Sequence, residues 1–408
     1  MRHHYLPFAN SANDWQLVSS LYPEPAGCRI TLQSVLQSSG ASSENQRRPT
    51  CKLWVDCGVD GLHFKRIRDP HDDTNRKYRA YIGRFPRYDL VADPTFQQQP
   101  SRNELKEFVR AILDTAFQAV PEANWLSVPQ LPYTEGRQRS KINKLMAEIT
   151  AEWRSAARYK GKLILPIILA TASQANLKSV RRPKVDLASA CFEASNADGV
   201  WVADSTLNDQ DGARNFESTR FPDLINFHEE LNSALARGSP AEPVSVAGPY
   251  WAINIVLWAR GLVKIPAVGL GKSFQYHIAG GRLMNPRVRI ALPPLKRLAV
   301  YTTDLRTWIE EVARILPKAD GAHAEFAGLL RNIQHLHRDD AARRQVARFH
   351  RGWMDKLESV PPAGRALALY QDFSSAYVLG MKLNKALPEP EEVRDPARIA
   401  RQFMVNCL

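Results

Sequence analysis

The sequence predicts an α/β protein built on a closed parallel (β/α)8 barrel of the TIM type, followed by an all-helical C-terminal extension. Short apolar runs, many of them β-branched, alternate with helical patterns between residues 28 and 301. From residue 305 onward the pattern is helical only. A closed barrel gives every half-buried strand a neighbour on both sides and a helix outside it. The alternative is an open doubly wound sheet.

Eight apolar runs are expected to be strands. They cover residues 28–35, 52–57, 125–130, 163–170, 199–204, 244–247, 267–270 and 298–301. Between them, Ser101 and Glu104 have the spacing of a capping box at the start of a helix. Further helices are expected over 140–153, from Pro222 to a stop at Gly238, and over 251–260. The first unit lacks a clear helix because residues 36–49 are polar.

Two domains follow from this pattern. Residues 1–304 form the barrel domain, and a basic insertion at about 61–100 is expected to be an exposed loop or hairpin over the barrel mouth. Residues 305–408 form a helical subdomain, with helices expected over 305–315, 322–337, 341–357 and 363–383.

The composition is that of an ordinary globular protein, with 44% hydrophobic and 24% charged residues over 408 positions, which excludes disordered, collagen-like and coiled-coil chains. The charge is less ordinary. A formal net charge of +13 predicts an anionic partner such as a nucleic acid, a nucleotide or an acidic lipid. Residues 243–303 contain no Asp or Glu at all, as an anion-binding surface would require. The alternative is a chance gap in a segment that includes an apolar helix and buried strands.

The start of the chain has no signal-peptide pattern, and no run is long and apolar enough to span a bilayer. We therefore expect a cytoplasmic protein with no membrane partner. The five cysteines have no Cys-x-x-Cys spacing, which predicts reduced thiols rather than disulfides or a zinc site. No metal or cofactor is expected, and the sequence leaves the oligomeric state open.

A small-residue turn lies inside the acid-free segment. Gly269 and Gly271 allow backbone N–H groups to converge on an oxyanion, and Lys272 adds a positive charge. In a barrel with these strands the turn follows the seventh strand, a recurrent phosphate-binding position. Arg282, after two further glycines, is expected to supply a second such turn. An ordinary glycine turn with a solvated lysine is the alternative.

Carboxylates follow three of the expected strands. Asp56, Asp204 and Asp304 stand at or just after strand ends, and Asp60 lies one turn beyond Asp56. Chemistry in such barrels takes place at the C-terminal ends of the strands, where two aspartates can divide into a nucleophile and an acid–base partner. The alternative role for each is to cap a helix or close a turn.

The segment 267–272, Ala-Val-Gly-Leu-Gly-Lys, with Tyr276 downstream, resembles the strand and turn that contact the base in tRNA-guanine transglycosylases. The segment 55–61, Val-Asp-Cys-Gly-Val-Asp-Gly, is similar to an Asp-Ser-Gly-Gly turn of the same family. The resemblance covers residues 50–304. It implies a barrel that exchanges guanine for a deazaguanine through an aspartate nucleophile, and divergent relatives that act in DNA modification and antiphage defence.

The chain also departs from that family. The cysteine and histidine zinc site is absent, and Leu270 stands where the family has Glu. The late nucleophilic aspartate would fall in the acid-free segment, so Asp304 is the nearest carboxylate. Either Asp56 or Asp204 has taken over the nucleophile role, or base exchange has been lost.

The leading hypothesis is thus an enzyme that acts on a nucleobase or N-glycosidic substrate. Lys272 would bind phosphate, Gln275 and Tyr276 would lie near the base, and Asp56 and Asp204 would supply nucleophilic or acid–base catalysis. A non-catalytic barrel that binds nucleic acid or an acidic protein is the first alternative. The second is a lyase that uses a lysine, either Lys162 or Lys272.

Overall fold

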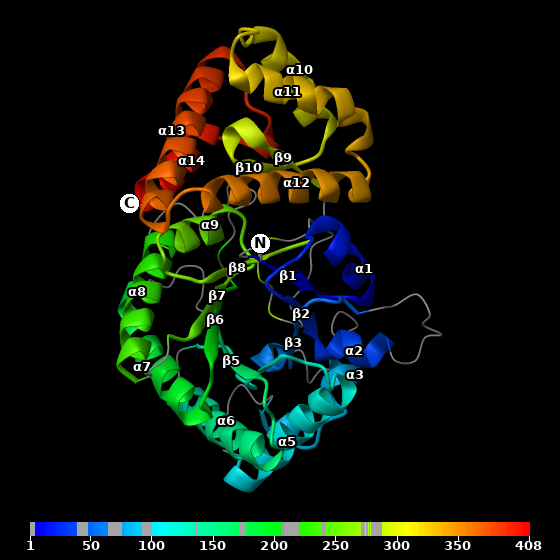
Figure 1. The fold of residues 1–408 in the computed structure, drawn as a ribbon, viewed down its shortest axis with the longest axis vertical. Coiled ribbons are helices and arrows are strands. Elements are labelled where there is room, and N and C mark those ends of the chain that lie inside the picture. Colours follow the sequence, from blue (N-terminus) through cyan, green and yellow to red (C-terminus); the bar gives the residue numbers. More distant parts are fainter. Residues whose placement is uncertain are drawn as a thin grey trace.

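The computed structural model describes residues 5–38, 48–63, 76–91, 100–134, 137–170, 177–205, 207, 220–238, 242–270, 274, 276, 278 and 288–408. Eight parallel strands close into a barrel, which confirms the predicted fold class (Figure 1). The strands are β1 (Leu6–Ala9), β2 (Cys28–Thr31), β3 (Leu53–Asp56), β4 (Trp125–Ser127), β5 (Lys162–Leu169), β6 (Gly199–Asp204), β7 (Val244–Ala247) and β8 (Ile265–Val268).

The prediction is wrong for one of the eight expected barrel strands. The run 298–301 corresponds to β10 (Arg297–Val300), which pairs antiparallel with β9 (Arg289–Leu292) outside the barrel. The missing barrel strand is β1, which pairs with both β2 and β8 and closes the cylinder. It has only four residues and contains Pro7, so it has almost no periodicity to detect. The glycine turn therefore follows the eighth strand of the barrel instead of the seventh.

Helices surround the barrel in the described part of the chain. They are α1 (Ala12–Leu21), α2 (Leu32–Ser38), α3 (Arg76–Ile82), α4 (Tyr88–Val91), α5 (Arg102–Ala119), α6 (Arg137–Ala156), α7 (Leu177–Ser195), α8 (Arg220–Gly238) and α9 (Ala252–Ala259). The predicted capping box of Ser101 and Glu104 begins α5. Within the insertion, the described residues 76–91 contain the short helices α3 and α4 and bury Tyr81 and Phe85, so this part is neither a hairpin nor an exposed loop.

Alternation along each strand divides the apolar side chains between two layers. Trp54 and Trp201 point into the barrel, whereas their strand neighbours Val55 and Val202 pack against the outer helices. Inside the barrel, Trp54 meets Phe8 at 5.7 Å and Trp201 at 5.3 Å between ring centroids, all edge to face. Edge-to-face rings fill the interior because the positive edge of one meets the negative face of the next.

The C-terminal extension contains α10 (Thr303–Ile315), α11 (Gly321–Asn332), α12 (Asp339–Glu358), α13 (Pro362–Ala386) and α14 (Pro396–Asn406). In Figure 1, α12 lies across the barrel beside α1 and α9, with α10 and α11 above it. The β9–β10 hairpin contributes to both cores: Ala291 and Leu298 join the outer layer of the barrel, and Ile290 and Leu292 pack with α10 and α11.

Buried aromatic contacts join α12 to the barrel. Trp251, just before α9, contacts Phe349, His350 and Trp353 of α12 at centroid distances of 5.9, 5.5 and 6.3 Å. His350 is fully buried and also meets Tyr22. Burial lowers the pKa of His350 from 6.5 to about 3, because a charged imidazolium would lose its hydration there. His350 is therefore neutral in the folded protein.

This predicts an acid-sensitive junction. Between the unfolded and folded pKa values of His350 the unfolded chain binds more protons, so the free energy of unfolding declines as the pH falls. We expect wild type to lose about 1.4 kcal/mol more per pH unit than His350→Phe, from about pH 6 down to about pH 4. Urea unfolding at a series of pH values measures this difference. His337→Phe, at an exposed histidine, is the control; parallel curves for wild type and His350→Phe would contradict the prediction.

Candidate functional site

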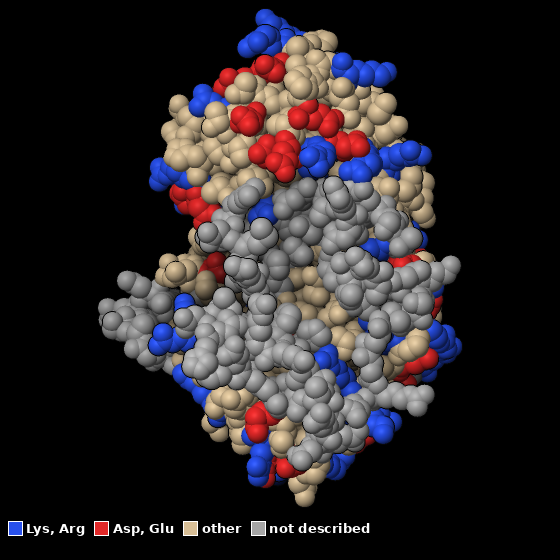
Figure 2. Space-filling model, turned by 180° about the vertical axis from the view of Figure 1, so that it is seen from behind, with Lys and Arg blue, Asp and Glu red and all other residues tan. Residues whose placement is uncertain are grey.

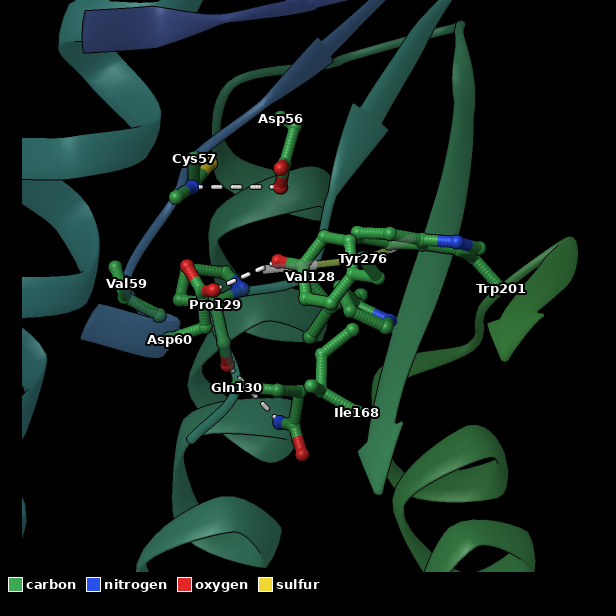
Figure 3. A pocket seen from close by; sticks show the side chains of 12 residues that line it. Asp56, Cys57, Val59, Asp60, Val128, Pro129, Gln130, Ile168, Trp201 and Tyr276 are labelled. Carbon is green, nitrogen blue, oxygen red and sulfur yellow. Dashed lines mark hydrogen bonds between the residues drawn. The ribbon is translucent and has the colours of Figure 1, made fainter. Parts of the chain in front are cut away.

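The candidate site lies at the C-terminal ends of the strands, where the interior of the barrel opens. The described residues enclose a cavity of about 10 Å³ there, which is room for one water molecule. It is lined by Asp56, Cys57, Gly58, Val59, Asp60, Val128, Pro129, Gln130, Pro166, Ile168, Trp201 and Tyr276 (Figure 3). These side chains come from β3, β4, β5, β6 and the segment after β8, so the site unites distant parts of the chain.

A buried ion pair lies beneath the cavity. Arg29, in the middle of β2, points into the barrel, where its Nη2 donates to Oδ2 of Asp56 at the end of β3. Its Nη1 donates to Asn10 Oδ1 at 3.0 Å. The guanidinium lies over Phe8 and Trp201, at 4.6 and 4.9 Å from their ring centroids. The cation therefore meets a carboxylate and two aromatic faces, which together offset its loss of hydration.

The ion pair keeps Arg29 charged. Burial opposes the charged guanidinium, but Asp56, with Tyr276 and Asp60 further away, more than compensates and raises the pKa of Arg29. Asp56 is held on its other side as well, since its Oδ1 accepts from the backbone N–H of Gly58 at 3.3 Å. The position of this carboxylate is thus fixed by two donors.

A second carboxylate meets a tyrosine above the pair. Asp60, in the short helical turn after β3, accepts a hydrogen bond from the hydroxyl of Tyr276 at 2.7 Å, and both residues are buried (Figure 3). The ring of Tyr276 packs edge to face on Trp201 at 5.0 Å. Burial raises the pKa of Tyr276 well above its usual range, and Asp60 raises it further. Tyr276 therefore keeps its proton and acts as a donor.

Neighbouring elements hold the turn between the two carboxylates. Gly58 has a φ of +59°, a backbone conformation that side chains with a Cβ disfavour. From α3, the hydroxyl of Tyr78 donates to Gly58 O at 2.9 Å, and that of Tyr81 donates to Cys57 O. The thiol of Cys57 is buried, and burial together with Asp56 raises its pKa. Helix α3 of the insertion thus braces the turn.

The structure brings together only some of the residues expected at the site. Asp56 and Tyr276 line the cavity, together with Asp60, which was expected one turn beyond Asp56, and Gln130. Gly269 is buried directly after β8. Gly271, Lys272, Gln275 and Arg282 lie outside the described residues.

Asp204 does not share this cavity. It follows Ala203, whose side chain faces the barrel interior, so alternation turns Asp204 outward toward the helices. There it is fully buried and accepts from Nε of Arg220, the first residue of α8, at 2.5 Å. The structure does not bring it beside Asp56, because β6 presents its last side chain to the opposite layer, and its catalytic role stays a prediction.

Asp304 is also remote. It was expected after a barrel strand, but β10 lies outside the barrel, and Asp304 is exposed in the first turn of α10. Thr302 caps that helix by accepting from the N–H of Leu305 at 3.1 Å. Lys162 is the first residue of β5, at the end of the barrel away from the site, which removes it as a catalytic lysine at the mouth.

Arg29 is the main site residue that sequence reasoning missed. A signal was present: in the run Cys-Arg-Ile-Thr of β2, an arginine stands among apolar residues of an expected strand. A charged side chain within such a run either ends the strand or meets an opposite charge in the core. The run of β3 ends in Asp56, its neighbour in the sheet, which supplies that partner.

The described surface carries both signs of charge. On the face seen in Figure 2, Lys and Arg side chains are interspersed with Asp and Glu, and a band of acidic residues crosses the C-terminal helical part near the top. The described residues of this face therefore show no continuous basic surface of the kind that follows a nucleic-acid backbone. The predicted nucleic-acid partner stays a prediction.

Among the described residues no group of three or more His, Cys, Asp or Glu is placed to hold a metal ion, and no helix is long and apolar enough to cross a membrane. The chain matches no protein-family model, and neither a curated protein nor a solved structure is detectably similar to it. The site must be interpreted from its own chemistry.

The buried pair predicts strong coupling between Arg29 and Asp56. Asp56→Asn or Arg29→Met alone leaves an uncompensated buried group, and each is expected to lower the free energy of unfolding by about 3–5 kcal/mol. The double variant should cost about 1–3 kcal/mol less than the sum of the two single variants. Urea unfolding of all four proteins measures this coupling.

The exposed pair of Arg306 and Glu310 on α10, 3.0 Å apart, provides the matched control. The same cycle there, with Arg306→Met and Glu310→Gln, should give a coupling of only about 0.3–0.5 kcal/mol. Costs that simply add at Arg29 and Asp56 would contradict the proposed energetic role of the buried pair.

Proposed function

We propose that the protein binds a planar nitrogen heterocycle of the nucleobase type at the C-terminal mouth of the barrel and acts on its N-glycosidic bond. The observation that carries the proposal is the contact of Tyr276 with Asp60 and Trp201. The aromatic ring of Tyr276 already occupies the mouth. It packs edge to face on the indole of Trp201, and its hydroxyl donates a hydrogen bond to the carboxylate of Asp60.

A nucleobase offers the same two features as the tyrosine ring. Its flat apolar faces suit the space beside Trp201, and its ring or exocyclic N–H groups suit a carboxylate acceptor such as Asp60. Because the cavity holds only about one water molecule, at about 10 Å³, a base would replace the Tyr276 ring instead of binding beside it. Asp60 would then accept a hydrogen bond from an N–H group of the base instead of from the hydroxyl of Tyr276.

Asp56 is the carboxylate best suited to the reaction. As a base leaves its sugar, the anomeric carbon becomes electron-poor, and a nearby carboxylate can form a bond to it or activate a water molecule. Asp56 lines the same cavity as Asp60, and its ion pair with Arg29 holds the carboxylate in place there. The resemblance to tRNA-guanine transglycosylases points to the same class of substrate.

A second function has an observation of its own in its favour. Both oxygens of Asp56 already accept hydrogen bonds, one from Arg29 and one from Gly58. A carboxylate with two donors is a weaker nucleophile than a free one. A barrel that binds the heterocycle but no longer exchanges it is therefore the alternative.

The test measures heterocycle binding by the full-length protein. Isothermal titration with adenine, guanine and 7-deazaguanine should show binding of at least one of them. Asp60→Asn should weaken that binding by about tenfold to a hundredfold, because it replaces a charge-assisted hydrogen bond of about 1.5–3 kcal/mol. Asp304→Asn, the same substitution at an exposed aspartate outside the barrel, should leave the affinity unchanged.

Exchange of radiolabelled base into tRNA or DNA then separates the two functions. Exchange supports the enzyme, and binding without exchange supports the non-catalytic barrel. If no heterocycle binds, or if Asp60→Asn and Asp304→Asn behave alike, the nucleobase site is refuted.

A further inference from the structure

Two cysteines meet at the end of the barrel away from the candidate site, where β2 and β3 begin. Cys28 is the first residue of β2, and Cys51 lies two residues before Leu53, the start of β3. The backbone N–H of Cys28 donates to the carbonyl of Lys52 at 2.8 Å, which ties the two segments together. The thiol of Cys28 donates to the carbonyl of Arg29 at 3.7 Å, and the sulfur of Cys51 is near enough to shift its pKa.

The two thiols differ in access. Cys28 is fully buried, whereas Cys51 is half-buried and lines a cavity of about 420 Å³ between α1 and the strand starts. Val18 and Ser19 of α1, Glu24, Pro25, Ala26, Thr50 and Lys52 form the rest of its lining. A small reagent in this cavity can reach Cys51, whereas Cys28 is fully buried and is not part of the lining.

The pKa shifts of the two thiols also favour Cys51 as the more reactive one. The neighbouring thiol of Cys28 lowers the pKa of the Cys51 thiol, against the opposing effect of burial. The same proximity, together with burial, raises the pKa of Cys28. Burial also raises the pKa of Cys57, Cys191 and Cys407. Of the five cysteines, Cys51 alone combines a lowered pKa with access to a cavity.

We propose that Cys51 and Cys28 form a peroxide-oxidisable dithiol, in which Cys51 at the cavity is attacked first and the buried Cys28 resolves the product into a disulfide. The oxidant is a hydroperoxide, a small neutral molecule for which the cavity has room. Accessible low-pKa thiols beside a second cysteine are the usual sites of reversible thiol oxidation.

The proposed chemistry balances in two steps. The thiolate of Cys51 forms a bond to one peroxide oxygen, the O–O bond breaks, and the departing hydroxide takes a proton and leaves as water. The sulfur of Cys28 then attacks the sulfenic acid of Cys51, the S–O bond breaks, and the proton of Cys28 leaves with the hydroxide as a second water. Two electrons pass from the thiol pair to hydrogen peroxide.

The test uses the full-length protein and hydrogen peroxide as the probe. After a brief exposure the remaining thiols are alkylated in denaturant, and the peptides are examined by mass spectrometry. Wild type should lose two alkylation sites and give a cross-link between Cys28 and Cys51. In Cys28→Ser the reaction should stop at a sulfenic acid on Cys51, which dimedone traps. Cys51→Ser should leave Cys28 reduced, and Cys191→Ser, at a buried thiol, should behave as wild type.

A measurement on wild type alone guards against variants that fail to fold. Site-resolved alkylation of the native protein with iodoacetamide should modify Cys51 at least about tenfold faster than Cys191, as a lowered pKa and an open cavity require. Equal rates at the two cysteines, a cross-link between any other pair, or wild-type oxidation that ends in a sulfenic acid without a cross-link would each overturn the proposal.

Discussion

The ion pair between Arg29 and Asp56 determines what the mouth of the barrel can hold. A barrel of eight strands has an interior just wide enough to be filled by side chains, and here the rings of Phe8, Trp54 and Trp201 are among those that fill it. A guanidinium in such surroundings needs a carboxylate close by, because a buried charge without a partner is very costly. Asp56 is that carboxylate, and its position fixes the start of the turn that follows β3.

The rest of the site follows from this turn. Gly58 bends the turn, and α3 holds its carbonyl groups by hydrogen bonds. The turn places Asp60 next to Tyr276, which follows the last strand of the barrel. Two carboxylates thus lie at one mouth in different surroundings, Asp56 paired with a cation and Asp60 with a neutral hydroxyl. In the proposed function, Asp60 accepts a hydrogen bond from the base while Asp56 acts on the sugar carbon, and this asymmetry suits that division.

The fold was more predictable from the sequence than the site. Apolar runs of strand length alternate with amphipathic helices over most of the barrel, so the barrel class followed from periodicity. Of the barrel strands only β1 was not predicted, because a strand of four residues that includes a proline shows too little periodicity. The hairpin strand β10 was counted as the eighth barrel strand instead. Because β10 was mistaken for a barrel strand, Asp304 was predicted at the barrel mouth, although it lies in α10 outside the barrel.

The site depended on details that periodicity does not contain. Asp56 and Asp204 both end apolar strands, but one faces inward and the other outward, and the difference lies in which neighbouring residues fill the interior. Arg29 was overlooked because its partner is 27 residues away in sequence and becomes its neighbour only in the sheet. The C-terminal ends of the strands predict where a site is located. Whether the last side chain of each strand faces inward or outward decides which residues line it.

A crystal structure of the protein grown with 7-deazaguanine or guanine tests the central claim most directly. The account predicts a flat ligand against Trp201, hydrogen-bonded to Asp60 in the place of the Tyr276 ring, with the pair of Arg29 and Asp56 intact beneath it. A ligand bound elsewhere while Tyr276 keeps its bond to Asp60, or a mouth in which Arg29 and Asp56 are apart, would contradict it.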